Sequence, residues 1–175
     1  DVQLMRAGTG VTHSEYNHSN DELLHLLQIW ILPEERGRLP AYAQRHFPAP
    51  ERGNVLRLVV SRDGRDDSLS IHQNTALFAT SLDPGASVSH GLAAGRHAWV
   101  HVARGQIDLN GVCLEAGDGA AVSEEREITI GDTAGHQVVF VSHCQRGDRV
   151  RIIGARKPTG TERRQYEEGS GKEIG

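Results

Sequence analysis

The strongest local structural signal in this chain is the stretch Gln106-Ile107-Asp108-Leu109-Asn110-Gly111-Val112-Cys113-Leu114. Asn110-Gly111 lies between two short apolar runs, and both residues tolerate the positive φ that a type I′ turn requires. The pattern therefore predicts a tight β-hairpin that pairs residues 107–109 with residues 112–114.

Further short apolar runs lie on both sides of this hairpin and are separated by Gly, Asp and Asn turn residues. The predicted strands are residues 55–60, 69–73, 76–80, 98–103, 106–109, 119–122, 127–130 and 137–141. Regularly spaced short strands are typical of a sandwich or barrel. The composition agrees, because 20 glycines and only 5% aromatic residues suit tight turns more than packed helices. We therefore predict an all-β fold.

The first fifty residues have a different pattern. Residues 23–32 form a near-continuous apolar run that ends at Pro33, which predicts a buried strand with Trp30 in the core. Residues 38–53 contain three prolines, which break any long helix and predict an irregular connector on the surface.

Length, charge and cysteine content exclude several classes of protein. The 175 residues allow one good-sized domain or two small ones. Neither a membrane-spanning apolar run nor an export signal occurs, and Cys113 and Cys144 are expected to be reduced thiols, so we predict a cytoplasmic protein without a membrane partner. Residues 1–143 carry a net charge of −7 and residues 144–175 carry +3. This weak basic charge, without interleaved aromatic residues, argues against nucleic-acid binding.

A candidate metal site lies in Gly10-Val11-Thr12-His13-Ser14-Glu15-Tyr16-Asn17. On a strand, His13 and Glu15 would project from one face and could bind a single metal ion. A His/carboxylate iron site normally needs three or more protein donors, so further ligands would have to come from His18, His25, His72 or a symmetry partner. The alternative is a solvent-facing pair that binds no metal. Nucleophile-elbow, P-loop and dinucleotide-binding motifs do not occur in the sequence.

Several segments together resemble the pirin family of bicupins. The resemblance is carried by residues 7–17 and 24–31 and continues, toward bacterial members, through residues 44–47, 61–66, 87–90 and 110–111 to about residue 141. It implies cupin barrels, with residues 1–53 as the C-terminal part of the first, metal-type cupin and its connector and residues 54–142 as the second cupin. It also implies one iron or other transition-metal ion, with nickel or zinc as alternatives to iron. Several bacterial pirins have quercetin 2,3-dioxygenase activity on a flavonol, whereas mammalian pirin is a nuclear iron-dependent cofactor.

The resemblance also implies which residues act. Pirin metal ligands are two His of an H-x-H motif and the His and Glu of an H-S-E-x-N motif, and the second pair falls on His13 and Glu15. We therefore predict both as metal ligands and Glu15 also as a catalytic base. Because no H-x-H precedes His13, we expect the chain to lack the first half of the first cupin and to have weak or no activity. The alternative is a non-enzymatic cupin module, as a homodimer that pairs through free strand edges.

The second cupin is predicted to bind no metal. The cupin pattern places Gly91, Ala93 and Ala98 at the ligand positions, whereas His90 and His97 fall one residue away and would face the opposite side of a strand.

One strand of this barrel has a predicted inner and outer face. Ala98, Val100 and Val102 are expected to point into the barrel, while Trp99 and His101 face outward and pack against the first domain.

Residues 143–175 are predicted to form a basic tail with a short strand at 150–153, a short helix at 162–168 and a disordered end. Their sequence resembles the C-terminal end of the BrnT ribonuclease toxins. The match covers only about 30 residues of the toxin fold, so we expect no ribonuclease role. A pirin-like segment followed by a BrnT-like segment suggests a chimeric reading frame.

Overall fold

Strands make up nearly all of the regular structure in the computed structural model, which describes residues 1–132 and 137–145. The strands are β1 (Val2–Arg6), β2 (Ala41–Arg45), β3 (Arg57–Ser61), β4 (Leu69–Ser70), β5 (Thr75–Leu82), β6 (Ser87–Gly91), β7 (Arg96–Arg104), β8 (Gln106–Leu109), β9 (Val112–Glu115), β10 (Gly119–Val122), β11 (Glu127–Asp132) and β12 (Gln137–Gln145). One short helix, α1 (Ala49–Arg52), and one 3₁₀ turn (Arg65–Asp67) complete the described elements. The all-β prediction is confirmed.

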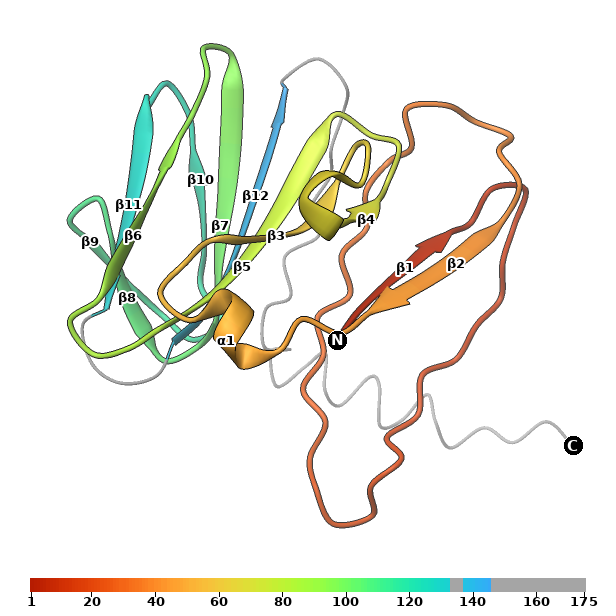
Figure 1. Cartoon of the computed structure of the whole chain (residues 1–175), viewed down its shortest axis with the longest axis horizontal. Helices are drawn as coiled ribbons and strands as arrows, with labels where there is room; N and C mark the ends of the chain where they lie inside the picture. The colour runs from red at the N-terminus through yellow and green to blue at the C-terminus, as the bar shows by residue number, and fades with distance from the viewer. Residues whose placement is uncertain (133–136, 146–175) are drawn as a thin grey trace, which may run out of the picture.

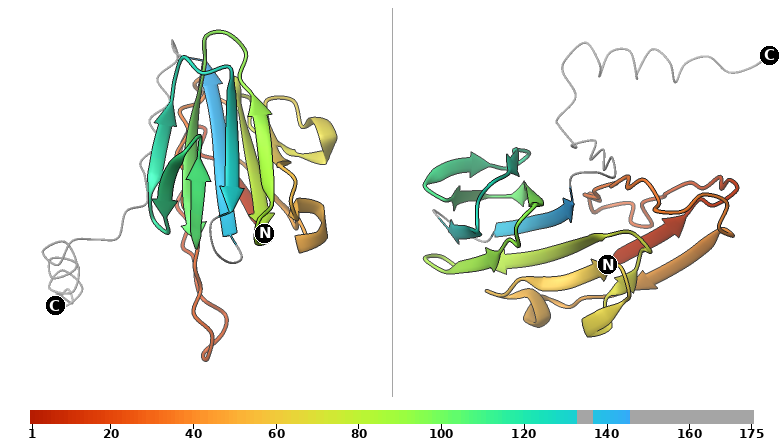
Figure 2. Two further views of the ribbon diagram at one scale, coloured as in Figure 1. Left: turned by 90° about the vertical axis from the view of Figure 1, so that its left-hand side faces the viewer. Right: turned by 90° about the horizontal axis from the view of Figure 1, so that it is seen from above.

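Two sheets pack face to face to form the larger part of the molecule (Figure 1; Figure 2, right). One sheet has the strand order β10-β7-β12-β5-β3-β4 and the other β6-β11-β8-β9. Every strand pair is antiparallel except β3 with β4. Non-consecutive neighbours such as β5 and β12 mean that segments far apart in the sequence close this sandwich, as in a cupin barrel.

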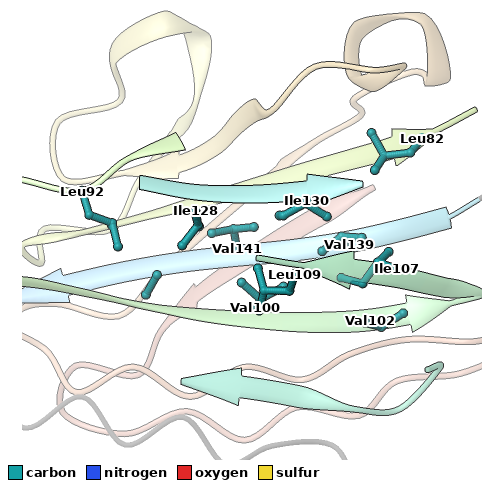
Figure 3. Packing of buried hydrophobic residues seen from close by; sticks show 11 residues of the cluster. Leu82, Leu92, Val100, Val102, Ile107, Leu109, Ile128, Ile130, Val139 and Val141 are labelled. Atoms are coloured by element: carbon teal, nitrogen blue, oxygen red, sulfur yellow. The ribbon is translucent and has the colours of Figure 1, made fainter. Parts of the chain in front are cut away.

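The core of the sandwich is aliphatic and fully enclosed (Figure 3). Its fully buried side chains, each with no more than 1% of its surface exposed, include Leu82, Val100, Val102, Ile107, Ile128, Ile130, Val139 and Val141. Burying one such side chain stabilises the fold by about 1.5–3 kcal/mol. The interior of this barrel is therefore a packed core and contains apolar side chains at its centre.

The predicted hairpin at Asn110-Gly111 is confirmed. Leu109 pairs with Val112 across the turn, and both turn residues have positive φ, 49° for Asn110 and 85° for Gly111. The Asn110 side chain accepts a hydrogen bond of 2.7 Å from the Thr129 amide, so the turn is also anchored to β11.

The two faces of β7 are as predicted. Ala98, Val100 and Val102 lie in the core, and Trp99 and His101 lie on the opposite face. The indole of Trp99 covers Gly119 of β10 so closely that a Cβ at Gly119 would lie 2.3 Å from Trp99 Cζ2.

A separate two-stranded sheet, β1 with β2, lies beside the β3–β4 end of the larger sheet (Figure 1). Val2 and Leu4 of β1 pack against a second apolar cluster that includes Phe47, Val59 and Leu77. This cluster lies on the face of the six-stranded sheet that is turned away from the main core, and it joins the N-terminal segment to the barrel.

The prediction of an irregular connector at residues 38–53 is wrong for part of that range, which contains β2 and α1. The prolines flank these elements. Pro40 precedes β2, Pro48 is the residue before α1, and Pro50 lies in its first turn, where the missing N–H has no partner to lose.

The buried strand predicted at residues 23–32 is also wrong. Residues 7–40 contain no strand, Leu23 is fully exposed, and the side chain of Trp30, predicted in the core, is 64% exposed. Apolar content alone does not make a strand, because its backbone groups need a neighbouring strand to pair with. Within the described residues no strand pairs with this segment.

The other predicted strands agree with β3 to β5 and β7 to β12 within a few residues, except that residues 71–73 lie beyond β4. The predictions missed β1, β2 and β6. The predicted strand and helix of the tail lie outside the described residues. In the part of the chain that the structure describes, no helix is long and apolar enough to cross a membrane.

Candidate functional site

His13 and Glu15 line one cavity of about 490 Å³. Its other lining residues come from β1, from the start of β2 and from the segment between them: Gln3, Met5, Val11, Ser14, Pro40, Ala41 and Tyr42. Both His13 and Glu15 are exposed to solvent. The structure therefore brings the two predicted metal ligands together, on an irregular segment and not on the strand that their spacing predicted.

The floor of the cavity is one face of the β1–β2 sheet. Met5 pairs with Tyr42 and Gln3 with Gln44, and side chains that lie opposite each other in an antiparallel pair share a face. The alternate residues of β1 face the second apolar cluster. Strand alternation therefore divides this small sheet into a core face and a cavity face.

A tight turn at Ala7–Gly10 positions the segment that carries His13. The Gly10 amide donates to the Ala7 carbonyl at 2.8 Å, and Gly8 has a φ of +56°. A Cβ at Gly8 would lie 2.2 Å from the carbonyl oxygen of Arg38. This close approach requires glycine, and it places the turn before residues 11–15 directly beside residues 38–40, which lead into β2.

Asn17, which ends the H-S-E-x-N motif, closes the loop that follows the site. Its Nδ2 donates to the Glu22 carbonyl at 2.6 Å, and its Oδ1 accepts from the Ser19 amide at 3.2 Å. Ser19 Oγ in turn accepts from the Glu22 amide at 2.9 Å. The asparagine therefore has a structural role in shaping the loop after Glu15.

The donor types at this site suit a transition metal, but their number is too small. Imidazole and carboxylate are both good ligands for iron, nickel or zinc, and such sites normally use at least three protein donors. Among residues 1–132 and 137–145, no three His, Cys, Asp or Glu side chains come together as a metal-binding group. His18, His25 and His72 therefore do not complete the site within the described chain.

The histidines near the second cupin's ligand positions make other contacts. The ring centroids of His90 and Phe78 lie 4.7 Å apart. Burial lowers the pKa of His90. His97 Nδ1 lies 2.8 Å from Ser123 Oγ. Ala98, at the carboxylate position, is part of the apolar core. The absence of metal from this barrel remains a prediction.

His101 lies on the outer face of β7, where only 8% of it is exposed. Burial lowers its pKa, and the charge of His25 acts in the same direction, while a hydrogen bond with the Asp118 backbone and the Asp118 charge oppose the shift.

Sequence reasoning missed the cavity residues Gln3, Met5 and Tyr42. They belong to no motif. The alternation of side chains between the two faces of β1 and β2 could have identified them, but neither strand was predicted.

Two family models and several curated relatives match this chain. A family model described as Pirin matches residues 1–31, and one described as Quercetinase C-terminal cupin domain matches residues 58–142. A protein named quercetin 2,3-dioxygenase from Escherichia coli K12 is 45% identical over 130 residues, which are 74% of this chain and 55% of that protein. A putative quercetin 2,3-dioxygenase from Pseudomonas aeruginosa is 38% identical over 142 residues, 81% of this chain and 61% of the relative.

Solved structures agree with these relatives. The bacterial pirin YhhW from Escherichia coli in complex with nickel(II) superposes with a TM-score of 0.74 at 41% identity, over 82% of this chain and 60% of that one. The chain thus spans little more than half the length of the curated relatives it matches. Two matching family models, the sandwich topology and these relatives lead to one assignment: the chain belongs to the pirin family of cupin proteins.

Proposed function

We propose that this chain is part of a metal-dependent quercetin 2,3-dioxygenase in which His13 and Glu15 bind a divalent transition metal. The observation that carries the proposal is that both side chains line the same cavity. The names of the relatives support the reaction, and the nickel(II) complex of YhhW supports a divalent metal. Iron is the metal that the family resemblance implies, and nickel and zinc are the alternatives.

The cavity has a suitable size and lining for a flavonol. Small-molecule sites commonly have volumes of about 300–1,000 Å³, and this cavity has about 490 Å³. Met5, Val11 and Tyr42 offer apolar and aromatic contact surface, while Gln3 and Ser14 offer hydrogen bonds.

Glu15 has two proposed roles, as a ligand and as a base. A metal bound here would polarise the substrate or oxygen. The Glu15 carboxylate would accept a proton from a flavonol hydroxyl and so leave the negative charge on the substrate oxygen. His13, which lines the same cavity, would supply the second donor through an imidazole nitrogen.

We propose that the remaining donors come from protein outside the described residues or from a second copy of the chain. Two donors alone seldom hold a catalytic metal, so weak or no activity is expected of these 175 residues by themselves.

The test is the metal content per chain after loading with iron(II) or nickel(II) and removal of the excess. If a second copy of the chain supplies the missing donors, the wild-type chain is expected to retain metal near stoichiometry, per chain or per dimer, and His13→Ala is expected to lose it. His18→Ala is the matched control, because His18 is an exposed histidine of the same segment that does not line the cavity. Unchanged metal content in His13→Ala would refute the site. A chain that retains metal would then be assayed for quercetin oxidation.

The domain division proposed is residues 1–53 for the metal-type part, 54–142 for the second cupin and 143–175 for the tail. Family matches at 1–31 and 58–142 support the first two.

We also propose a homodimer that forms through strand edges. The β1–β2 sheet has only two strands among the described residues, so each has a free edge, and a two-stranded sheet is marginally stable without further packing. Light scattering of the purified chain tests this directly, and a monomeric mass at high concentration would refute it. The non-enzymatic alternative finds no support in the comparisons.

A further inference from the structure

The cavity face of the β1–β2 sheet has an unusual composition for a solvent-facing surface. It presents two glutamines, a methionine and a tyrosine as the opposed pairs Gln3–Gln44 and Met5–Tyr42. None of these four side chains carries a charge. The side chain of Tyr42 is 59% exposed and lines the cavity that contains His13 and Glu15.

The hydroxyl of Tyr42 has a hydrogen-bond partner on its own strand. Its hydroxyl donates to Gln44 Oε1 at 2.5 Å, and both residues lie on the same face of β2. This hydrogen bond and the strand backbone together favour one orientation of the ring. A tyrosine that is oriented before a ligand arrives loses little conformational freedom when the ligand binds.

The chemistry of this face matches a planar, hydroxylated aromatic ring. An aromatic ring stacks well on tyrosine, and the thioether of Met5, opposite Tyr42, makes favourable contacts with aromatic edges. The amide of Gln3 can donate to and accept from phenolic hydroxyls. Within the described residues, the side chain of Gln3 has no hydrogen-bond partner of its own, so it is available to a ligand.

We propose that Tyr42, oriented by Gln44, is a positioning residue that holds an aromatic ring of the substrate on the β1–β2 sheet, while the reacting end of the substrate meets His13 and Glu15. This inference rests on the proposed function and adds the part of the site that binds and orients the substrate. The site then combines oxygen- and nitrogen-donor groups with an aromatic platform in one cavity.

The test is an equilibrium titration of quercetin into the 175-residue chain in the presence of a chelator, followed by the absorbance of quercetin. The wild-type chain is expected to bind quercetin without metal. Tyr42→Ala is expected to weaken binding about tenfold, equivalent to about 1.4 kcal/mol. Tyr42→Phe keeps the ring but loses the hydrogen bond to Gln44, so it is expected to weaken binding by only a few fold.

Tyr16→Ala is the matched control. Tyr16 is 83% exposed, lies in the same segment as His13, and does not line the cavity. It is expected to bind quercetin within twofold of the wild-type chain. Circular dichroism of each variant checks folding, and both tyrosines are exposed enough for replacement to leave the fold intact.

A parallel titration with nickel(II) alone separates this inference from the proposed function. Tyr42→Ala is expected to bind nickel as the wild-type chain does, and His13→Ala is expected to lose nickel and keep quercetin. If Tyr42→Ala binds quercetin as tightly as Tyr16→Ala, or if the wild-type chain does not bind quercetin under chelation, the role of Tyr42 is refuted. If no variant or wild-type chain binds nickel, the proposed metal site fails, and the quercetin result still decides the role of Tyr42.

Discussion

Replacing Gly8 with alanine is expected to open the site without disturbing the barrel. Gly8 has a φ of +56°, and its missing side chain leaves room for the backbone of residues 38–40. An alanine Cβ would lie 2.2 Å from the Arg38 carbonyl oxygen and 2.7 Å from the Pro40 nitrogen. Because both atoms belong to the backbone, no side-chain rotation relieves the overlap, and the two segments must move apart.

Two contributions set the size of the effect. An L-residue with a side chain in the left-handed region costs about 1–2 kcal/mol. An ordinary contact of the Cβ would be 3.4–4 Å, so the overlap with the Arg38 oxygen exceeds 1 Å, and overpacking of this kind typically costs about 1–3 kcal/mol more. The sum for Gly8→Ala is about 2–5 kcal/mol.

Gly37→Ala is the matched control, because Gly37 has a φ of +76° and its Cβ would meet no atom within 4 Å. Gly37→Ala therefore incurs the cost of a left-handed backbone conformation but not the cost of overpacking. Amide hydrogen exchange along the β1–β2 ladder measures the local opening free energy of this sheet, which is expected to open at lower cost than the barrel core. Exchange in Gly8→Ala is expected to be about 5- to 150-fold faster than in Gly37→Ala, the factor that corresponds to the overpacking cost of about 1–3 kcal/mol.

The urea midpoint of the barrel should change little in either variant, and nickel binding should weaken in Gly8→Ala because residues 11–15 move away from the start of β2. Equal exchange rates in the two alanine variants would refute the argument that close backbone approach at Gly8 shapes the site.

Three further predictions concern the barrel and its attachment. Gly119→Ala is expected to lose about 1–3 kcal/mol of unfolding free energy, because the ring of Trp99 occupies the position of the new Cβ. The same variant should alter the near-ultraviolet circular dichroism of Trp99. Gly131→Ala is the control, since the space around its Cβ is open, and it should change stability by less than about 0.5 kcal/mol. Phe47→Ala should lower the unfolding free energy by about 3–5 kcal/mol, because the ring is only 4% exposed and lies in the second apolar cluster. Two guanidinium groups, of Arg45 and Arg57, also lie 5.3 Å from the ring centre. A loss near zero would mean that this cluster does not support the fold. Burial holds the pKa of His101 below its ordinary 6.5, so the unfolded chain takes up a proton at higher pH than the folded chain does, and stability should fall as the pH drops from 6.5 toward the folded pKa. Urea midpoints between pH 8 and 5 should decline less in His101→Gln, and equal declines would contradict this reasoning.

The barrel strands were predictable because their signals are local. Asn110-Gly111 specifies its own turn through the positive φ of both residues, and alternation along β7 correctly separates Ala98, Val100 and Val102 from Trp99 and His101. β6 was missed because Ser87-Val88-Ser89-His90-Gly91 has a single aliphatic side chain, and pairing with β11 makes it a strand.

The candidate site could be predicted only in part. His13 and Glu15 were found from their motif, and the structure brings them to one cavity. Tyr42 and Met5 could not be found, because their place in the site depends on the pairing of β1 with β2, which are more than thirty residues apart in the chain. Trp30 was placed in the core for its apolar surroundings, and the structure leaves it 64% exposed.

Local sequence alone determined the all-β character of this chain, its main hairpin, the inner and outer faces of its central strand and the pair of candidate metal ligands. Turn chemistry and side-chain alternation act over a few residues, so they do not depend on what the rest of the chain does. The tertiary structure decided which segments pair, that residues 23–32 form no strand, and that an uncharged face with Tyr42 lies next to His13. These features depend on whether distant backbone groups find partners, and that is a property of the whole fold.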